Sequence, residues 1–197
     1  MSLIFAMCLF SFSMSISPGP VNFISLFSGL NYGFKRTFPF VSGATIGFSL
    51  LLLTVGLGLY QILDSNPFLI KFMSGLGSLF IIYMGYKTYY ANSELQHKDQ
   101  GVPSFLNGFL MQWLNPKAWI ACVSGTSLFM KPNDFTPLIM FCTLYFLICY
   151  IGIALWSFMG TRIQKILMNK KRRILFNRIM GSTLVALAIY LFCSQIF

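Results

Sequence analysis

Long apolar stretches alternate with short polar connectors along the whole 197-residue chain. A transmembrane helix needs about 20 apolar residues, and these stretches lack the residue-by-residue alternation of membrane barrel strands. The run from Leu50 to Leu53, for example, contains no polar position. The pattern predicts an all-α membrane protein with six transmembrane helices, at about residues 3–30, 39–63, 67–90, 104–130, 135–160 and 174–195.

Two of these predicted helices, the first and the fourth, are broken by proline. The breaks fall at residues 17–20 and 115–117, and the spacing of 98 positions from Pro18 to Pro116 also relates another proline pair, at 39 and 137. Proline removes a backbone donor and leaves carbonyl groups without partners. In a membrane such breaks persist only where protein or a water-filled cavity satisfies those groups. Matching broken helices in two halves of a chain point to a transporter's substrate site.

Each half of the chain contributes three predicted helices. An odd number makes the second half enter the membrane from the opposite side, so two related halves would be inverted repeats. We therefore predict a single transmembrane domain over 1–197, with one repeat at about 1–90 and the other at about 104–197.

Composition narrows the class of protein. The chain is 56% hydrophobic and only 9% charged, whereas soluble domains carry about 25% charged residues. The net charge of +10 does not indicate nucleic-acid binding, because the basic residues lie between apolar stretches. All five cysteines lie in apolar stretches without a Cys-x-x-Cys pair, so we predict no metal site, and nothing in the sequence indicates a cofactor.

The distribution of lysine and arginine predicts the orientation. Only Lys71 and Lys131 lie on the side of the second and fourth connectors, and Lys117 lies within a predicted helix. Because cytoplasmic loops carry the excess of basic residues, both termini are expected outside the cytoplasm. The other 11 basic residues, on the expected cytoplasmic side, are Lys35, Arg36, Lys87, Lys98, Arg162, Lys165, Lys170, Lys171, Arg172, Arg173 and Arg178.

Acidic residues and histidine are missing from the predicted spans. The four carboxylates and the single histidine fall in or beside connectors, namely Asp64, Glu94, Asp99, Asp134 and His97. A membrane enzyme would need a catalytic base, and a cation exporter would need ligands within the bilayer. The sequence therefore favours a protein that is not an enzyme.

Lys117 is the one basic residue near the centre of a predicted span. A charge there costs at least about 2.5–3.5 kcal/mol, so it should face a polar cavity and have a partner. Lys117 follows Pro116 at the first turn of a restarted helix, whose free N–H groups and partial positive charge favour an anion. The alternative is structural, with the ammonium group paired to a backbone carbonyl.

The first break offers complementary chemistry. Prolines on both sides of Gly19 free several carbonyl groups, which can accept hydrogen bonds from an ammonium group. A site with donors for a carboxylate and acceptors for an amine suits a zwitterionic amino acid. Asn115 could instead cap the second half-helix. The predicted substrate-binding residues are Ser17, Pro18, Gly19, Pro20, Asn22, Gln112, Asn115, Pro116 and Lys117.

At these residues the chain resembles the LysE/RhtB family of bacterial amino acid exporters. The resemblance covers essentially the whole length and rests on the two break motifs, on Gly33 followed by Gly43 and Gly47, and on Gly75. Residues 112–119 are most similar to cysteine/O-acetylserine exporter-like members. Many relatives carry Asn or Asp directly after the Pro-Gly-Pro, where this chain has Val21.

The resemblance implies a bacterial inner-membrane transporter that exports small neutral amino acids or derivatives, of the cysteine/O-acetylserine or threonine/homoserine type. It also implies coupling to protons and alternating access. Some relatives export metal cations such as cadmium, which leaves that substrate as one alternative. A membrane scaffold that transports nothing is another, with the proline breaks as packing devices. The sequence leaves the oligomeric state open, a homo-oligomer included.

Overall fold

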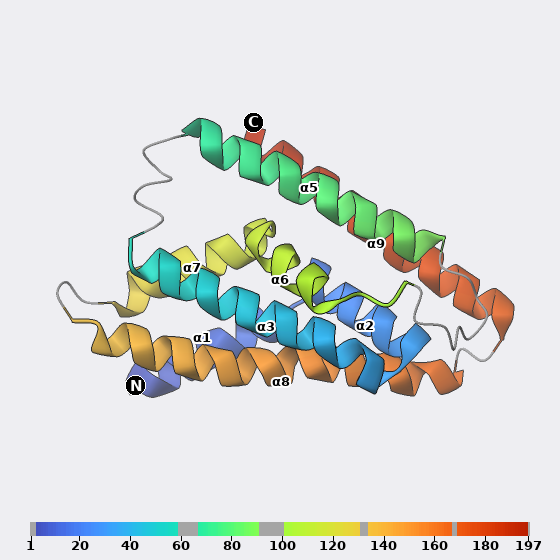
Figure 1. Cartoon of the computed structure of the whole chain (residues 1–197), viewed down its shortest axis with the longest axis horizontal. Coiled ribbons are helices and arrows are strands. Elements are labelled where there is room, and N and C mark those ends of the chain that lie inside the picture. The colour runs from blue at the N-terminus through green and yellow to red at the C-terminus, as the bar shows by residue number, and fades with distance from the viewer. Residues whose placement is uncertain (1–2, 59–66, 91–100, 131–133, 167–168, 197) are drawn as a thin grey trace.

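The computed structural model of the protein describes residues 3–58, 67–90, 101–130, 134–166 and 169–196. Over this part of the chain the prediction of an all-α protein is confirmed (Figure 1). The helices of the described residues are α1 (Leu3–Ile16), α2 (Pro20–Tyr32), α3 (Phe34–Gly56), α5 (Pro67–Tyr89), α6 (Phe105–Trp113), α7 (Pro116–Phe129), α8 (Thr136–Ile166) and α9 (Lys170–Ile196).

Both predicted helix breaks are confirmed. The first separates α1 from α2, whose axes differ in direction by 59°, and the second separates α6 from α7. Pro20 and Pro116 each take the first turn of the half-helix that follows. Proline is well placed there, because that backbone position has no helical acceptor for an N–H group.

The number of membrane spans is confirmed only in part. Among the described residues, α3, most of α8 (Thr136–Ile163) and most of α9 (Lys170–Tyr190) are long and apolar enough to cross a membrane. The bent pair of α1 and α2 would make a fourth span. The spans found in the described residues do not include α5 or the α6–α7 pair, so six spans in two repeats stay a prediction.

The predicted connector over residues 161–173 is wrong in part. Helix α8 continues to Ile166, and α9 begins at Lys170. The four basic residues from Lys170 to Arg173 therefore belong to α9. Lysine and arginine are good helix formers, and the thickness of the bilayer limits an apolar stretch rather than a helix. The other long connector, predicted over 91–103, lies mostly outside the described residues.

The helices form two groups (Figure 1). Helices α5 and α9 lie side by side along one edge, and the other six helices pack together. Within the larger group, α8 packs against α1, α2 and α3, while α3 packs closely against α6. Glycine permits these approaches, because a Cβ atom at Gly29 would lie 2.0 Å from the Ser157 carbonyl oxygen, and one at Gly43 would lie 1.9 Å from that of Phe105.

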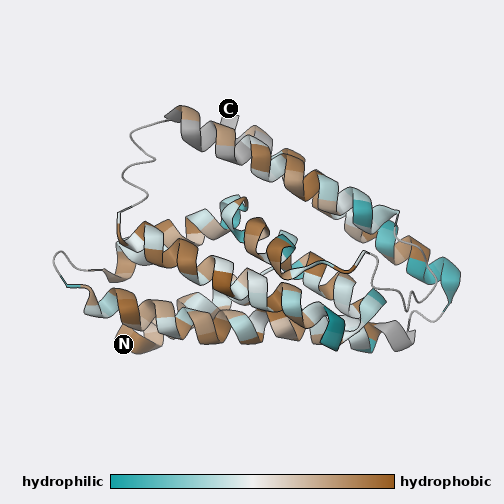
Figure 2. Cartoon of the chain, in the orientation of Figure 1, coloured by the Kyte–Doolittle hydropathy of each residue, from teal (hydrophilic) through white to brown (hydrophobic). Residues whose placement is uncertain are grey.

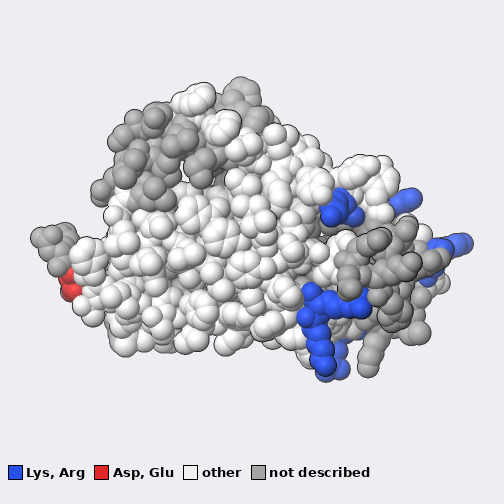
Figure 3. All heavy atoms as spheres, in the orientation of Figure 1, with Lys and Arg blue, Asp and Glu red and all other residues white. Residues whose placement is uncertain are grey.

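Apolar and charged residues are separated along the helices. Apolar residues recur along the lengths of the helices, and hydrophilic residues concentrate where α9 begins (Figure 2). Lysine and arginine gather at that same end of the molecule in the face shown in Figure 3, and the acidic atoms lie at the other end. Lys98 and Lys131, which the orientation prediction also counted, lie outside the described residues.

Candidate substrate-binding site

Side chains satisfy the carbonyl groups that the first break frees at the end of α1. The Asn22 amide donates to the carbonyl oxygens of Ser15 (2.8 Å) and Ser17 (2.9 Å). The Trp156 indole, from α8, donates to the Ile16 carbonyl at 3.1 Å. Asn22 is buried, so its bonds replace those that the chain loses at the prolines. The predicted site residue Asn22 thus holds the break together.

Lys117 crosses from the second break to the first. Its Nζ donates to the Ser17 carbonyl oxygen at 2.8 Å and to the Pro18 carbonyl oxygen at 3.2 Å. The structural alternative given for this lysine, pairing with a backbone carbonyl, is therefore present. Hydrogen bonds from an ionised donor are the stronger kind, so this contact ties the two breaks to each other.

The second break is organised by neighbouring residues. The side chain of Asn115 accepts a hydrogen bond from the Lys117 backbone N–H at 3.2 Å and caps α7, as expected for asparagine in this position. The Trp119 indole donates to the Trp113 carbonyl at 2.7 Å. Each of these bonds stays within the α6–α7 segment.

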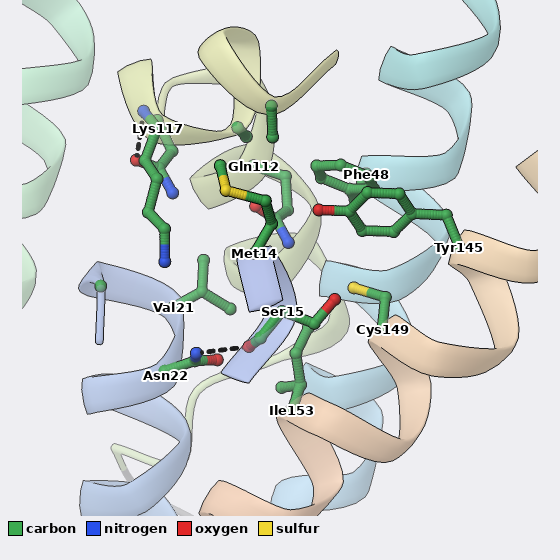
Figure 4. A pocket seen from close by; sticks show the side chains of 14 residues that line it. Met14, Ser15, Val21, Asn22, Phe48, Gln112, Lys117, Tyr145, Cys149 and Ile153 are labelled. Atoms are coloured by element: carbon green, nitrogen blue, oxygen red, sulfur yellow. Dashed lines mark hydrogen bonds between the residues drawn. The ribbon is translucent and has the colours of Figure 1, made fainter. Parts of the chain in front are cut away.

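A cavity lies where the two breaks meet (Figure 4). It is partly open, and its empty space, counted out to its open mouth, is about 390 Å³. Five predicted site residues line it. The residues that line it are Met14, Ser15, Gly19, Val21, Asn22, Phe48, Gln112, Asn115, Lys117, Ala118, Ala121, Tyr145, Cys149 and Ile153.

The other four predicted residues lie next to the cavity without lining it. Ser17 and Pro18 contribute the carbonyl oxygens that Lys117 contacts, and Pro20 and Pro116 begin the two half-helices. The position directly after the Pro-Gly-Pro, where this chain has valine, also borders the cavity. Val21 lines the cavity, as does Asn22, whose amide turns back to the carbonyl groups of α1.

Sequence reasoning missed the wall that α3 and α8 supply. Phe48 of α3 and Tyr145 of α8 stack with ring centroids 4.3 Å apart, and Cys149 lies one turn further along α8. Figure 4 shows these side chains across the cavity from Lys117. Helix α8 is apolar around most of its circumference, so no periodic signal could have shown which face of it meets the cavity.

Two further polar side chains, those of Ser15 and Gln112, line the cavity. The Ser15 hydroxyl is buried without a hydrogen-bond partner among the described residues. Gln112 is 5% exposed and also lines the cavity. Buried polar groups in proteins are normally hydrogen-bonded. The Ser15 hydroxyl is an exception to this rule.

The charged groups of the cavity are compatible with a zwitterion. Lys117 supplies a positive charge, and the carbonyl oxygens of Ser17 and Pro18 supply acceptors beside it. Within the part of the chain that the structure describes, no three histidine, cysteine, aspartate or glutamate residues come together as a metal site.

Comparison with known proteins agrees with this picture. The family model of the LysE type translocator matches residues 12–195. Cysteine/O-acetylserine efflux proteins of Escherichia coli (strain K12) and Shigella flexneri are each 22% identical to the chain over 180 residues, which cover 90% of this chain and 91% of theirs. No solved structure matches the chain.

Proposed function

The chain belongs to the LysE type translocator family, and from this premise we propose that it exports small neutral amino acids or their derivatives across a bacterial inner membrane. Membership makes it a multi-pass membrane transporter rather than an enzyme. The named efflux proteins act on cysteine and O-acetylserine, which makes these the first substrates to test. The threonine/homoserine type is the next.

One observation carries the proposal. The cavity between the two helix breaks is lined by the Lys117 ammonium group, the Ser15 hydroxyl and the Gln112 amide, and the carbonyl oxygens of Ser17 and Pro18, which accept from Lys117, lie beside it. A zwitterionic amino acid presents the matching groups, a carboxylate, an ammonium group and a short side chain. Concave sites with a few convergent polar groups are the usual form of small-molecule sites.

Alternating access around the breaks is supported by reciprocal packing of the two halves. The broken first helix packs on α8 of the second half, and α6, from the broken fourth helix, packs on α3 of the first half. The equivalent helices of the predicted repeats, α3 with α8 and α5 with α9, also pack against each other. Such exchange is expected of inverted repeats that rock around a central site.

The basic end of the molecule supports the expected orientation. The start of α1 and the last turn of α9 both lie away from the side of the molecule where lysine and arginine gather (Figures 1 and 3). The positive-inside rule then puts both termini outside the cytoplasm. Proton coupling completes the proposal and rests on the family resemblance.

The test is efflux from cells preloaded with cysteine, O-acetylserine, threonine or homoserine. Cells carry the native chain, Lys117→Ala or the control Lys35→Ala at matched membrane levels, because Lys35 is exposed at the basic end. We expect export by the native chain and the control, and its loss in Lys117→Ala.

Each other outcome has a defined meaning. If native cells release no amino acid faster than empty-vector cells, the proposed substrate class is wrong, and cadmium efflux becomes the next assay. If Lys117→Ala changes only the assembly or stability of the protein, the scaffold alternative is favoured. Equal export by all three chains would keep the transporter and contradict the proposed site.

A further inference from the structure

The carbonyl groups at the first break differ in the kind of donor that holds them. The Met14 carbonyl accepts from the Ser17 hydroxyl, the Ser15 carbonyl from Asn22, and the Ile16 carbonyl from Trp156. These donors are neutral. The Pro18 carbonyl oxygen is different, because it accepts from a charged amine on a long side chain. The Ser17 carbonyl oxygen accepts from that same amine and also from the Asn22 amide.

The two bonds from Lys117 differ in exposure, because the one to the Ser17 carbonyl is partly buried and the one to the Pro18 carbonyl is exposed. Lys117 is partly exposed and lines the cavity, and its bond to the Pro18 carbonyl lies in the exposed part of the site. Gly19, which has no side chain, lies against it, since a Cβ atom there would be 3.2 Å from the Lys117 Nζ. A ligand that takes the position of the Lys117 amine at the cavity would therefore meet the Pro18 carbonyl oxygen from its exposed side.

Resting on the proposed function, we propose that the Lys117 ammonium group stands where the ammonium group of the substrate binds. The incoming amine displaces Lys117 from the carbonyl oxygens of Ser17 and Pro18. Lys117 then turns to the substrate's carboxylate. Both groups are ammonium ions with three N–H donors, so one replaces the other at the same acceptors.

The exchange conserves charge pairing only for a complete amino acid. An ammonium ion displaced from its acceptors must find another partner, because an unpaired charge in a partly buried site is costly. The carboxylate of an amino acid supplies that partner. A simple amine brings none, and a simple carboxylate can meet Lys117 without competing for the carbonyl oxygens.

The exchange also links binding to the arrangement of the two halves. Lys117 belongs to α7, and the oxygens that it contacts belong to the first break, 100 and 99 residues away in the chain. A substrate that displaces Lys117 undoes the direct tie between the breaks. A ligand shifts a conformational equilibrium only through contacts that differ between the states, and the broken tie is such a contact.

Two fragments of an amino acid test this exchange, with methylammonium chloride as the amine and sodium acetate as the carboxylate. Binding to the purified full chain in detergent is followed by tryptophan fluorescence, since Trp156 contacts the first break and Trp119 the second. Tetramethylammonium chloride, which has the same charge but no N–H donor, is the ligand control. Lys35→Met is the protein control.

The two fragments should respond to Lys117→Met in opposite directions. Methylammonium should bind about tenfold more tightly once its competitor is removed, and acetate should bind about tenfold more weakly, as expected for hydrogen bonds to charged groups. Lys117→Arg retains a charged competitor and should keep methylammonium binding as weak as in the native chain. Tetramethylammonium and Lys35→Met should show no change.

Methylammonium binding that is equal or weaker in Lys117→Met than in the native chain overturns the proposal. If Lys117→Met does not fold, tighter binding of methylammonium to Lys117→Arg than to the native chain overturns it as well. The outcome is separable from the transport assay. Amino acid efflux with methylammonium indifferent to Lys117 would keep the proposed function and remove the exchange. The predicted responses to methylammonium and acetate in a chain that exports no amino acid would keep the exchange and contradict the proposed function.

Discussion

The two helix breaks begin their second half-helices in the same way, with proline in the first turn, but their polar groups are satisfied differently. At the second break the partners are local, because Asn115 caps α7 and Trp119 bonds to Trp113. At the first break they come from α2, α7 and α8, and Gly19 at the start of α2 offers no side-chain cap.

This difference distinguishes a self-contained break from one that depends on tertiary contacts. The second break keeps its hydrogen bonds for as long as the α6–α7 segment is folded. The first break loses bonds whenever α7 or α8 moves relative to α1. We therefore expect the first break to change its partners during transport and the second to move as a unit.

The largest expected effect concerns the contact between α5 and the second break. A Cβ atom at Gly77 would lie 1.9 Å from the Leu114 carbonyl oxygen, and one at Gly152 would lie 3.0 Å from the Ser15 side chain at the first break. We expect Gly77→Ala to cost about 3 kcal/mol of folding stability and Gly152→Ala about 1 kcal/mol, the two ends of the range for overpacking. Unfolding in detergent micelles measures both, and equal losses would contradict the difference.

The second prediction compares the two asparagines. Asn22→Ala leaves the Ser15 carbonyl without its donor in the protein interior, which should cost about 2–3 kcal/mol. Asn115→Ala removes only a helix cap, which should cost about 1 kcal/mol. The free energy of unfolding of the two variants is compared with that of the native chain. A larger loss for Asn115→Ala would show that the second break is the less self-contained.

The smallest effect on stability is expected at Gly19. Its backbone is extended, with φ −174°, so alanine fits without strain and stability should change by no more than about 0.5 kcal/mol. The new methyl group would lie 3.1 Å from the Lys117 Cδ and restrict that side chain, so efflux should fall severalfold. Lys35→Ala, at an exposed position outside the site, is the control and should export as the native chain does. Unchanged efflux in Gly19→Ala would argue against movement of Lys117.

Features that depend on neighbouring residues could be predicted from the sequence. Proline lacks a backbone donor wherever it occurs, so both breaks were located by the positions of Pro18 and Pro116. Asparagine before a proline-started helix caps it, and Asn115 does so. The apolar stretches likewise indicated helices, although the ends of α8 and α9 were misplaced, because a helix can continue beyond the bilayer core.

Features that depend on distant residues were decided by the tertiary structure alone. The sequence placed a charge in a broken helix, but only the packing of α7 beside α1 showed that Lys117 meets the carbonyl oxygens of Ser17 and Pro18. Phe48 and Tyr145 entered the site for the same reason. When a helix is apolar on nearly every side, its sequence pattern does not indicate which face turns inward. The packing against other helices determines that face.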